Sequence, residues 1–201
     1  MRIIDCIPRS EEWHSWRNRP TASEFSSFIT PARGDYAAGA TDYASRIVMR
    51  RMGLDEEILP SQWMEWGVEH EDHAKRAYEV ETGRTITDVG FVLPDHTDAF
   101  GGSPDGLVDP DGLIEVKCPA PWTLGVYHAR GVLPAQYIPQ IQGLLLITGR
   151  SWCDFWVWHP QVKPFLLLVK ADVAYQAKIA AGLLKLLAEI KTIEEKLSWK
   201  P

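Results

Sequence analysis

Apolar side chains recur three or four positions apart over much of the chain, which is the spacing of one face of an α-helix. This spacing predicts helices over residues 11–19, 21–30, 42–52, 61–82, 123–130, 135–148 and 171–197. Alternating apolar positions predict strands over residues 85–93, 98–103, 113–117, 152–158 and 164–170, of which the last two form a hairpin. Helices come first, then a sheet, then helices again. The predicted class is therefore α+β or mixed α/β, with a sheet flanked by helices.

Capping residues mark where some of these helices begin and end. Ser61 can cap the helix over residues 61–82, and Gly83 can close it. Pro139 either kinks the helix over residues 135–148 or belongs to its first turn, and the pattern leaves both readings open.

Length and composition indicate a single domain over residues 1–201. The 45% hydrophobic and 24% charged residues are ordinary for a soluble globular protein. No apolar run approaches the roughly 20 residues of a membrane-spanning helix, so no membrane association is expected. Three widely spaced cysteines, at positions 6, 118 and 153, match neither a disulfide framework nor a zinc site. We therefore expect a reducing, cytoplasmic location.

The formal net charge of −6 argues against a protein that coats DNA non-specifically, because phosphate binding depends on Lys and Arg. It does not exclude an enzyme that acts on DNA, since a metal-dependent nuclease gathers carboxylates where cations bind. The arginines are also clustered, as in Arg17 with Arg19.

Two carboxylates and a lysine are predicted to converge in the sheet. Glu115 and Lys117 are two apart in a strand, so their side chains leave the same face. Asp105 precedes a tight turn, so a hairpin can bring it opposite Glu115. Such ligands suit Mg²⁺ or Mn²⁺ bound to a phosphodiester, where Lys117 would orient or deprotonate water or stabilise charge on phosphorus. The alternative is a surface hairpin with an ordinary Glu–Lys pair.

Polar residues on neighbouring helices could extend this site. Glu71 could complete the metal shell, and the amides of Gln140 or Gln142 could bind the attacking water or a phosphate. Trp13, Arg17 and Ser23 could hold a phosphate at a helix start. For each of these residues, a solvated helix face or a core tryptophan is the alternative.

The other tryptophans are predicted to pack in the core. Trp152, Trp156 and Trp158 share one strand face, and Trp63 and Trp66 lie three apart on a helix. A stacking platform for single-stranded DNA would need exposed rings beside basic residues, which lie elsewhere in the sequence.

Six motifs follow one another from Trp13 to the last third of the chain. They occupy residues 13–17, 21–23, 66–71, 103–107, 115–119 and 137–142, and read WHSWR, TAS, WGVEHE, SPDGL, EVKCP and YIPQIQ. This ordered set resembles the phage lambda-type exonucleases, the YqaJ-like viral recombinases of the PD-(D/E)xK nuclease superfamily. The resemblance implies a central mixed β-sheet with a restriction-endonuclease-like core.

The same resemblance implies roles for individual residues. Metal would be bound by Asp105, Glu115 and the carbonyl of Val116, with Glu71 as a candidate further ligand. Lys117 would be the catalytic lysine, and Gln140, in preference to Gln142, the active-site glutamine. The residues that match the 5′-phosphate site are Arg17, Ser23 and Ser103, with Trp13 beside them.

We therefore expect a Mg²⁺-dependent 5′→3′ exonuclease, with Mn²⁺ as a substitute, that releases mononucleotides from double-stranded DNA and leaves 3′ overhangs. The family further implies a ring-shaped homotrimer, a single-strand annealing protein as partner, and a phage or prophage origin. An endonuclease or junction resolvase would instead cut closed circles. A catalytically silent DNA-binding protein is disfavoured by the intact Asp105, Glu115 and Lys117. A glycosidase would not need Lys117 and would survive EDTA.

Overall fold

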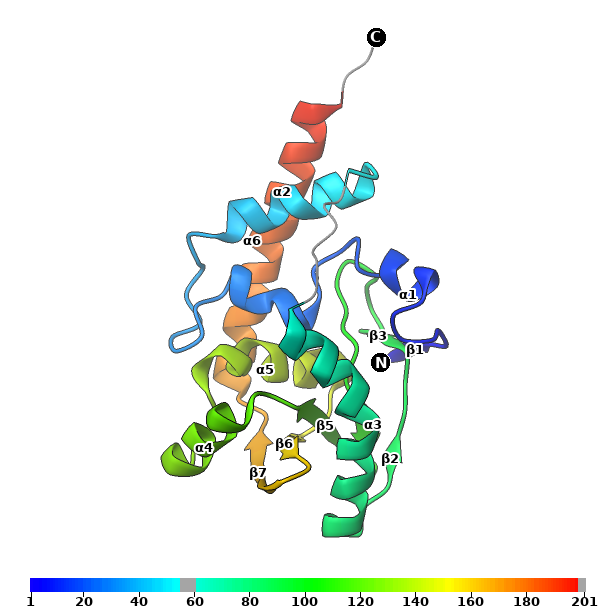
Figure 1. Ribbon diagram of the computed structural model, residues 1–201. Helices are drawn as coiled ribbons and strands as arrows, with labels where there is room; N and C mark the ends of the chain where they lie inside the picture. The colour runs from blue at the N-terminus through cyan, green and yellow to red at the C-terminus, as the bar shows by residue number, and fades with distance from the viewer. Residues whose placement is uncertain (55–60, 199–201) are drawn as a thin grey trace.

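The computed structural model describes residues 1–54 and 61–198 (Figure 1). Its α-helices are α1 (Glu11–Ser15), α2 (Ala40–Arg51), α3 (Gln62–Thr82), α4 (Pro121–Arg130), α5 (Ile138–Thr148) and α6 (Val173–Leu197). Two 3₁₀ helices are η1 (Ala22–Ser27) and η2 (Ala135–Tyr137). The strands are β1 (Arg2–Ile4), β2 (Ile86–Thr87), β3 (Phe91–Leu93), β4 (Gly106–Val108), β5 (Gly112–Lys117), β6 (Trp152–His159) and β7 (Val162–Lys170).

The central sheet has five strands in the order β2-β4-β5-β6-β7. All neighbours are antiparallel except β5 and β6, which are parallel and joined by a crossover through α4 and α5. A separate two-stranded sheet pairs β1 with β3. The prediction of a mixed sheet flanked by helices is thus confirmed, as is the hairpin of β6 and β7.

Helices cover both faces of the central sheet (Figure 1). On one face, Tyr78 of α3 packs in a cluster with Val116 and Trp156. On the other, Leu144 of α5 belongs to the larger core that contains Leu113. Because successive strand residues alternate between faces, Glu115 and Lys117 share the face of Leu113, which α5 covers.

The long helix α6 lies against α2, and both contribute to the same core as α5 and η1 (Figure 1). The cysteines Cys6, Cys118 and Cys153 are free thiols, and all three are buried. Within the described ranges, no helix is long and apolar enough to cross a membrane.

The helix predicted over residues 61–82 is confirmed at both ends. Ser61 Oγ accepts a hydrogen bond from the Met64 amide at 3.3 Å, and Gly83 closes the helix with φ +70°. Pro139 lies in the first turn of α5, where a missing N–H costs nothing, so the second reading of that proline is the correct one.

Other helix predictions had the wrong bounds. The helix predicted over residues 11–19 ends at Ser15, and that over residues 21–30 is the short 3₁₀ helix η1. Thr21 is the N-cap position of η1 and makes no side-chain capping bond, so Ser23 lies inside the element and does not cap it. The helix predicted over residues 42–52 starts two residues earlier, at Ala40.

The strand predicted over residues 85–93 is divided between two sheets, and the strand predicted over residues 98–103 is reduced to isolated bridges, one of which pairs Gly102 antiparallel with Val92. Residues 86–87 join the central sheet, whereas residues 91–93 pair with β1, a short strand that the pattern did not reveal. Gly90 lies at this change of sheet, and a Cβ there would be 2.4 Å from the Cys6 carbonyl oxygen. Residues 98–103 contribute only isolated bridges at Gly101 and Gly102.

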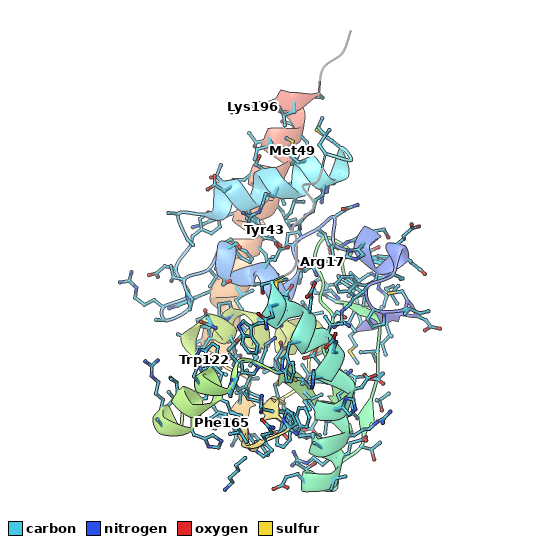
Figure 2. All side chains as sticks on the ribbon, viewed as in Figure 1. Arg17, Tyr43, Met49, Trp122, Phe165 and Lys196 are labelled. Atoms are coloured by element: carbon cyan, nitrogen blue, oxygen red, sulfur yellow. The ribbon has the colours of Figure 1, made fainter. Side chains whose placement is uncertain are left out.

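The tryptophan prediction holds for Trp156, which is 1% exposed, and Trp66, Trp152 and Trp158 are partly buried against the same cluster. It was wrong for Trp63, which is 37% exposed and packs edge-on against Trp122. Trp122, labelled on α4 in Figure 2, is still more exposed. A helical spacing of three does not reveal which face of a helix reaches the core.

Candidate active site

The hairpin of β4 and β5 sets Asp105 opposite Glu115. Gly106 pairs with Ile114, so Asp105 and Glu115 occupy the next position along the ladder. The Asp105 Oδ2 atom accepts a hydrogen bond of 2.6 Å from the Val116 amide. In an extended strand the N–H and C=O of one residue point to the same side, so the Val116 carbonyl also lies on the side of Asp105.

The turn of this hairpin is held from outside by Arg150. Its Nη1 atom donates to the carbonyl oxygens of Asp109 at 2.9 Å and Gly112 at 2.6 Å. At the other end, a Cβ on Gly106 would lie 2.3 Å from Ile86 Cγ2, so only glycine allows β2 and β4 to approach here. These contacts fix the position of the β4–β5 hairpin and therefore of Asp105, which directly precedes β4.

Glu115 is the centre of the side-chain contacts, and it is 1% exposed. Its Oε1 atom accepts from Lys117 Nζ at 2.5 Å and from Gln140 Nε2 at 2.6 Å. Its Oε2 atom is buried and has no hydrogen-bond partner among the described residues. An unsatisfied buried carboxylate oxygen is costly, and a bound cation would satisfy it.

The protonation of the site follows from burial and from close charges. Burial, and after it the charge of Glu115, raises the pKa of Asp105 to about 8. Burial acts to lower the pKa of Lys117, but the charges of Glu115 and Asp105 outweigh it and the pKa is raised. Lys117 is therefore an ammonium at neutral pH, suited to stabilise negative charge.

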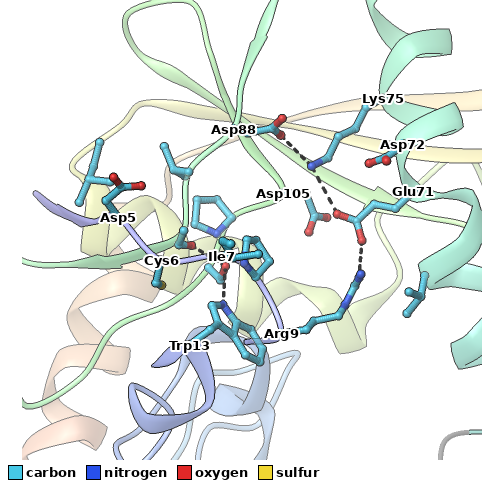
Figure 3. A pocket seen from close by; sticks show the side chains of 17 residues that line it. Asp5, Cys6, Ile7, Arg9, Trp13, Glu71, Asp72, Lys75, Asp88 and Asp105 are labelled. Carbon is cyan, nitrogen blue, oxygen red and sulfur yellow. Dashed lines mark hydrogen bonds and ion pairs between the residues drawn. The ribbon is translucent and has the colours of Figure 1, made fainter. Parts of the chain in front are cut away.

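Glu71 reaches the same region from α3, over the other face of the sheet. It lines a cavity of about 640 Å³ together with Asp105 (Figure 3). Its Oε2 atom is 2.6 Å from Arg9 Nη2, and its Oε1 atom is 3.4 Å from Lys75 Nζ. Across residues 1–54 and 61–198, no three His, Cys, Asp or Glu side chains are grouped closely enough to hold a metal ion. Glu71 therefore lies near Asp105 but is paired with Arg9 and Lys75.

The residues expected at a phosphate end lie beside this cavity. Trp13 and Ser103 line it, and Trp13 Nε1 donates to Ser103 Oγ at 3.2 Å. The guanidinium carbon of Arg17 lies 4.8 Å from the centre of the Trp13 ring. Ser23 is exposed on η1, and its hydroxyl is 3.4 Å from Thr21 Oγ1. Trp13 thus contacts both Ser103 and Arg17, whereas the Ser23 hydroxyl has no hydrogen bond to these three residues within the described part of the chain.

Gln142 has a structural role, although its spacing made it a candidate for the site. It is buried, its Nε2 atom donates to the Lys170 carbonyl at 2.8 Å, and its Oε1 atom accepts from the Asp172 amide at 2.8 Å. It therefore ties α5 to the start of α6. Gln140 is the glutamine that contacts Glu115.

Two charged residues near the site were missed from the sequence. Glu24 lies 3.9 Å from Arg17 and accepts a hydrogen bond of 3.0 Å from Arg50, so it links these two arginines. The sequence offered one indication of Glu24, which is its position directly after the candidate residue Ser23. Arg9 was missed because its partner Glu71 is 62 positions away in the sequence, beyond the reach of any local pattern.

The carboxylate pair fits a hard divalent cation. Asp105 and Glu115 offer only oxygen ligands, the Val116 carbonyl adds a neutral oxygen, and the unpartnered Glu115 Oε2 supplies a position where a cation would replace a missing contact. Mg²⁺ is commonly bound by one or two carboxylates with waters completing the shell, so this small set is sufficient.

Comparison with known proteins gives consistent matches. A model of the YqaJ-like viral recombinase domain matches residues 12–151, a segment that contains all six motifs. LHK-Exo, an alkaline exonuclease from Laribacter hongkongensis, is 33% identical, with a TM-score of 0.79 over 93% of this chain and 97% of that one. LHK-Exo in complex with dAMP is 34% identical, with a TM-score of 0.85 over 94% and 96%.

A more distant structure shares the fold. A phage-related exonuclease from Haemophilus somnus 129PT is 14% identical, with a TM-score of 0.71 over 90% of this chain and 96% of that one. A search of curated proteins gives no match.

Proposed function

The chain belongs to the YqaJ-like viral recombinase family, and from this premise we propose that it is a Mg²⁺-dependent 5′→3′ exonuclease of double-stranded DNA. It would start at 5′-phosphorylated ends, release mononucleotides and leave 3′ overhangs for strand annealing. The family and its exonuclease relatives support the class of enzyme. The observation that carries the proposal is Glu115, whose buried carboxylate has one oxygen held by Lys117 and Gln140 and the other without a partner among the described residues.

The metal would be held by Asp105, Glu115 and the Val116 carbonyl. Bound there, Mg²⁺, or Mn²⁺ in its place, would polarise the scissile phosphate and lower the pKa of a bound water. Glu71 would join this set only after leaving Arg9 and Lys75.

The protein's own residues would orient the substrate and stabilise charge. The Lys117 ammonium would donate to an oxygen of the scissile phosphate as negative charge develops there. Gln140 would hold Glu115 in place and present its amide to the attacking water. Neither role requires a change in the backbone, because both side chains already converge on Glu115.

The 5′-phosphate would be held by Arg17, Ser23 and Ser103 beside Trp13. A guanidinium suits a terminal phosphate because it can donate two parallel hydrogen bonds. Ser103 is two residues before Asp105, so a phosphate bound at Ser103 would place the next phosphodiester near the carboxylates. LHK-Exo binds dAMP, a mononucleotide, which supports mononucleotides as products.

We further propose a homotrimeric ring that encloses the DNA, a single-strand annealing protein as partner, and action in the bacterial cytoplasm for a phage or prophage. A ring would explain how a chain with a net charge of −6 retains DNA, because an enclosed duplex needs less electrostatic attraction.

The test is a gel assay on end-labelled linear duplexes with and without 5′-phosphate, beside a covalently closed circle, in Mg²⁺ and in EDTA. The proposal predicts loss of the linear 5′-phosphorylated duplex in Mg²⁺ alone, with the circle intact. Cutting of the circle would indicate an endonuclease, and an absence of metal-dependent cleavage would indicate a DNA-binding protein.

A further inference from the structure

Arg9 has a backbone conformation that L-residues rarely adopt. Its φ is +68°, and within residues 1–54 and 61–198 the only other non-glycine residue with positive φ is Asp109, in the tight turn between β4 and β5. Arg9 is the third residue of a turn in which the Ser10 amide donates to the Ile7 carbonyl at 3.1 Å, and this turn holds the conformation. The contact of Arg9 lies in the cavity beside Asp105.

The side chain of Arg9 crosses from the N-terminal segment to α3. Its Nη2 atom donates to Glu71 Oε2 at 2.6 Å, and Figure 3 shows the guanidinium reaching Glu71 beside Asp105. The side chain is still 50% exposed, so solvent and ligands can reach it. Arg9 is four residues before Trp13, which donates to Ser103. Arg9 therefore shares one cavity with Trp13 and Ser103 of the proposed 5′-phosphate site and with Asp105.

The charges around the cavity leave Arg9 as the cation best placed for a new partner. Among the described residues, the cavity is lined by five carboxylates, which are Asp5, Glu71, Asp72, Asp88 and Asp105. The lining cations are Arg9 and Lys75. Lys75 is already between two carboxylates, at 2.9 Å from Asp88 and 3.4 Å from Glu71, and its side chain is only 17% exposed.

We propose that Arg9 is a DNA-phosphate ligand of this active site, held by Glu71 until DNA enters. This inference rests on the proposed function. A phosphodiester offers Arg9 paired charged oxygens in place of one carboxylate oxygen, and a divalent cation bound by Glu71 would release the guanidinium. The exchange keeps a cation beside the substrate, and before DNA enters it gives Glu71 a second cationic partner besides Lys75.

The test measures binding without cleavage, using a short 5′-phosphorylated duplex in EDTA and fluorescence anisotropy over a range of salt concentrations. Arg9→Gln should weaken binding by roughly 3- to 10-fold and reduce the salt slope by about one, as expected when one phosphate contact is lost. Arg9→Lys should retain most of the affinity. Arg2→Ala is the matched control, because Arg2 lies in the same segment but pairs with Asp98 outside the cavity.

A second measurement tests whether Glu71 holds Arg9 away from DNA. Glu71→Gln should tighten DNA binding more than Asp72→Asn does, and only when Arg9 is present. Without DNA, Arg9→Gln should also strengthen Mn²⁺ binding, measured by electron paramagnetic resonance, because Glu71 then keeps only the more distant Lys75 as a cationic partner.

The inference is overturned if Arg9→Gln binds DNA as tightly as Arg2→Ala does. It is also overturned if Glu71→Gln still tightens DNA binding in a variant that carries Arg9→Gln as well. If Arg9→Gln does not fold, a Glu71→Gln protein that gains no more than Asp72→Asn overturns it equally. These readouts need no turnover. A wild-type protein that cuts nothing would refute the proposed function while the Arg9 result still stands.

Discussion

At the scale of single residues, Asp105 and Glu115 are held in very different ways. Glu115 has two donors on one oxygen, whereas Asp105 has one amide donor and a cavity in front of it. Burial of two like charges beside each other favours a proton on one of them. Ionisation of Asp105 at alkaline pH therefore destabilises the folded protein.

Replacing Asp105 with Asn should raise stability in EDTA. The Asp105 pKa is raised from 3.8 to about 8, so the folded protein binds more protons than the unfolded one between these values. Wild-type stability thus falls as pH rises through this window, and the variant avoids that loss. We expect a Tm gain of roughly 2–8 °C at pH 8, at about 2–4 °C per kcal/mol, and little gain at pH 4.

The same thermal scans in Mg²⁺ supply the control. Mg²⁺ should raise the Tm of the wild-type protein and leave that of Asp105→Asn nearly unchanged. A variant that is stabilised by Mg²⁺ as strongly as the wild type would remove Asp105 from the metal site.

Arg17 should decide the preference for 5′-phosphorylated ends. Arg17→Ala should lower kcat/KM on these ends by roughly 10- to 100-fold, the value of a charge-assisted hydrogen bond, with little change on 5′-hydroxyl ends. Arg19→Ala is the matched control. Arg19 also lies over a tryptophan, Trp16, at 4.6 Å, but it is not part of the proposed 5′-phosphate site. Equal losses on both kinds of end would refute the assignment.

At the scale of elements, α5 carries two glutamines with different functions. Gln140 contacts Glu115, and Gln142 holds Lys170 and Asp172 at the junction of β7 and α6. The spacing of two residues on a helix turns their side chains in different directions. One element thus contributes both to the proposed active site and to the packing.

This division predicts opposite effects of the same substitution. Gln142→Leu should destabilise the protein by about 1–3 kcal/mol, because it leaves a carbonyl and an amide without their partner, and should leave activity per folded molecule unchanged. Gln140→Leu should keep the Tm and lower the rate roughly 10²-fold. Chemical unfolding and initial rates on both variants provide the comparison, and a reversal of the two effects would exchange the roles.

The elements that sequence predicted well were those with strong local signals. The Ser61 cap and Gly83 define α3, and period-two alternation defines β5, so Glu115 and Lys117 were placed on one face correctly. The motifs then indicated Gln140 over Gln142. These features depend on residues close in sequence.

The elements that were missed depend on distant contacts. Strand β1 has three residues and exists through its pairing with β3, about 90 positions away. The two short strands β2 and β3 belong to different sheets because the N-terminal segment inserts beside Gly90. The ion pair of Arg9 and Glu71 likewise joins residues 62 positions apart.

At the scale of the whole molecule, the proposed ring makes a prediction about mass and salt. Light scattering on the purified protein should give three times the mass of one chain. Initiation on DNA ends should fall steeply with salt, because it depends on electrostatic encounter, whereas the rate of continued digestion should change little. A monomeric mass, or equal salt sensitivity of both phases, would contradict the ring.

The burial of all three cysteines also bears on how this protein can be handled and observed. Burial raises the pKa of Cys118 to about 12 and that of Cys153 well above its usual value, so both thiols stay protonated at neutral pH. A maleimide should therefore label the native protein slowly and the denatured protein at once. One new cysteine at an exposed position, such as Val173→Cys at the start of α6, should then accept a fluorophore alone, giving a background-free probe for following single molecules on DNA. Rapid labelling of the native wild-type protein, read by mass spectrometry, would show that one of the three sites opens readily.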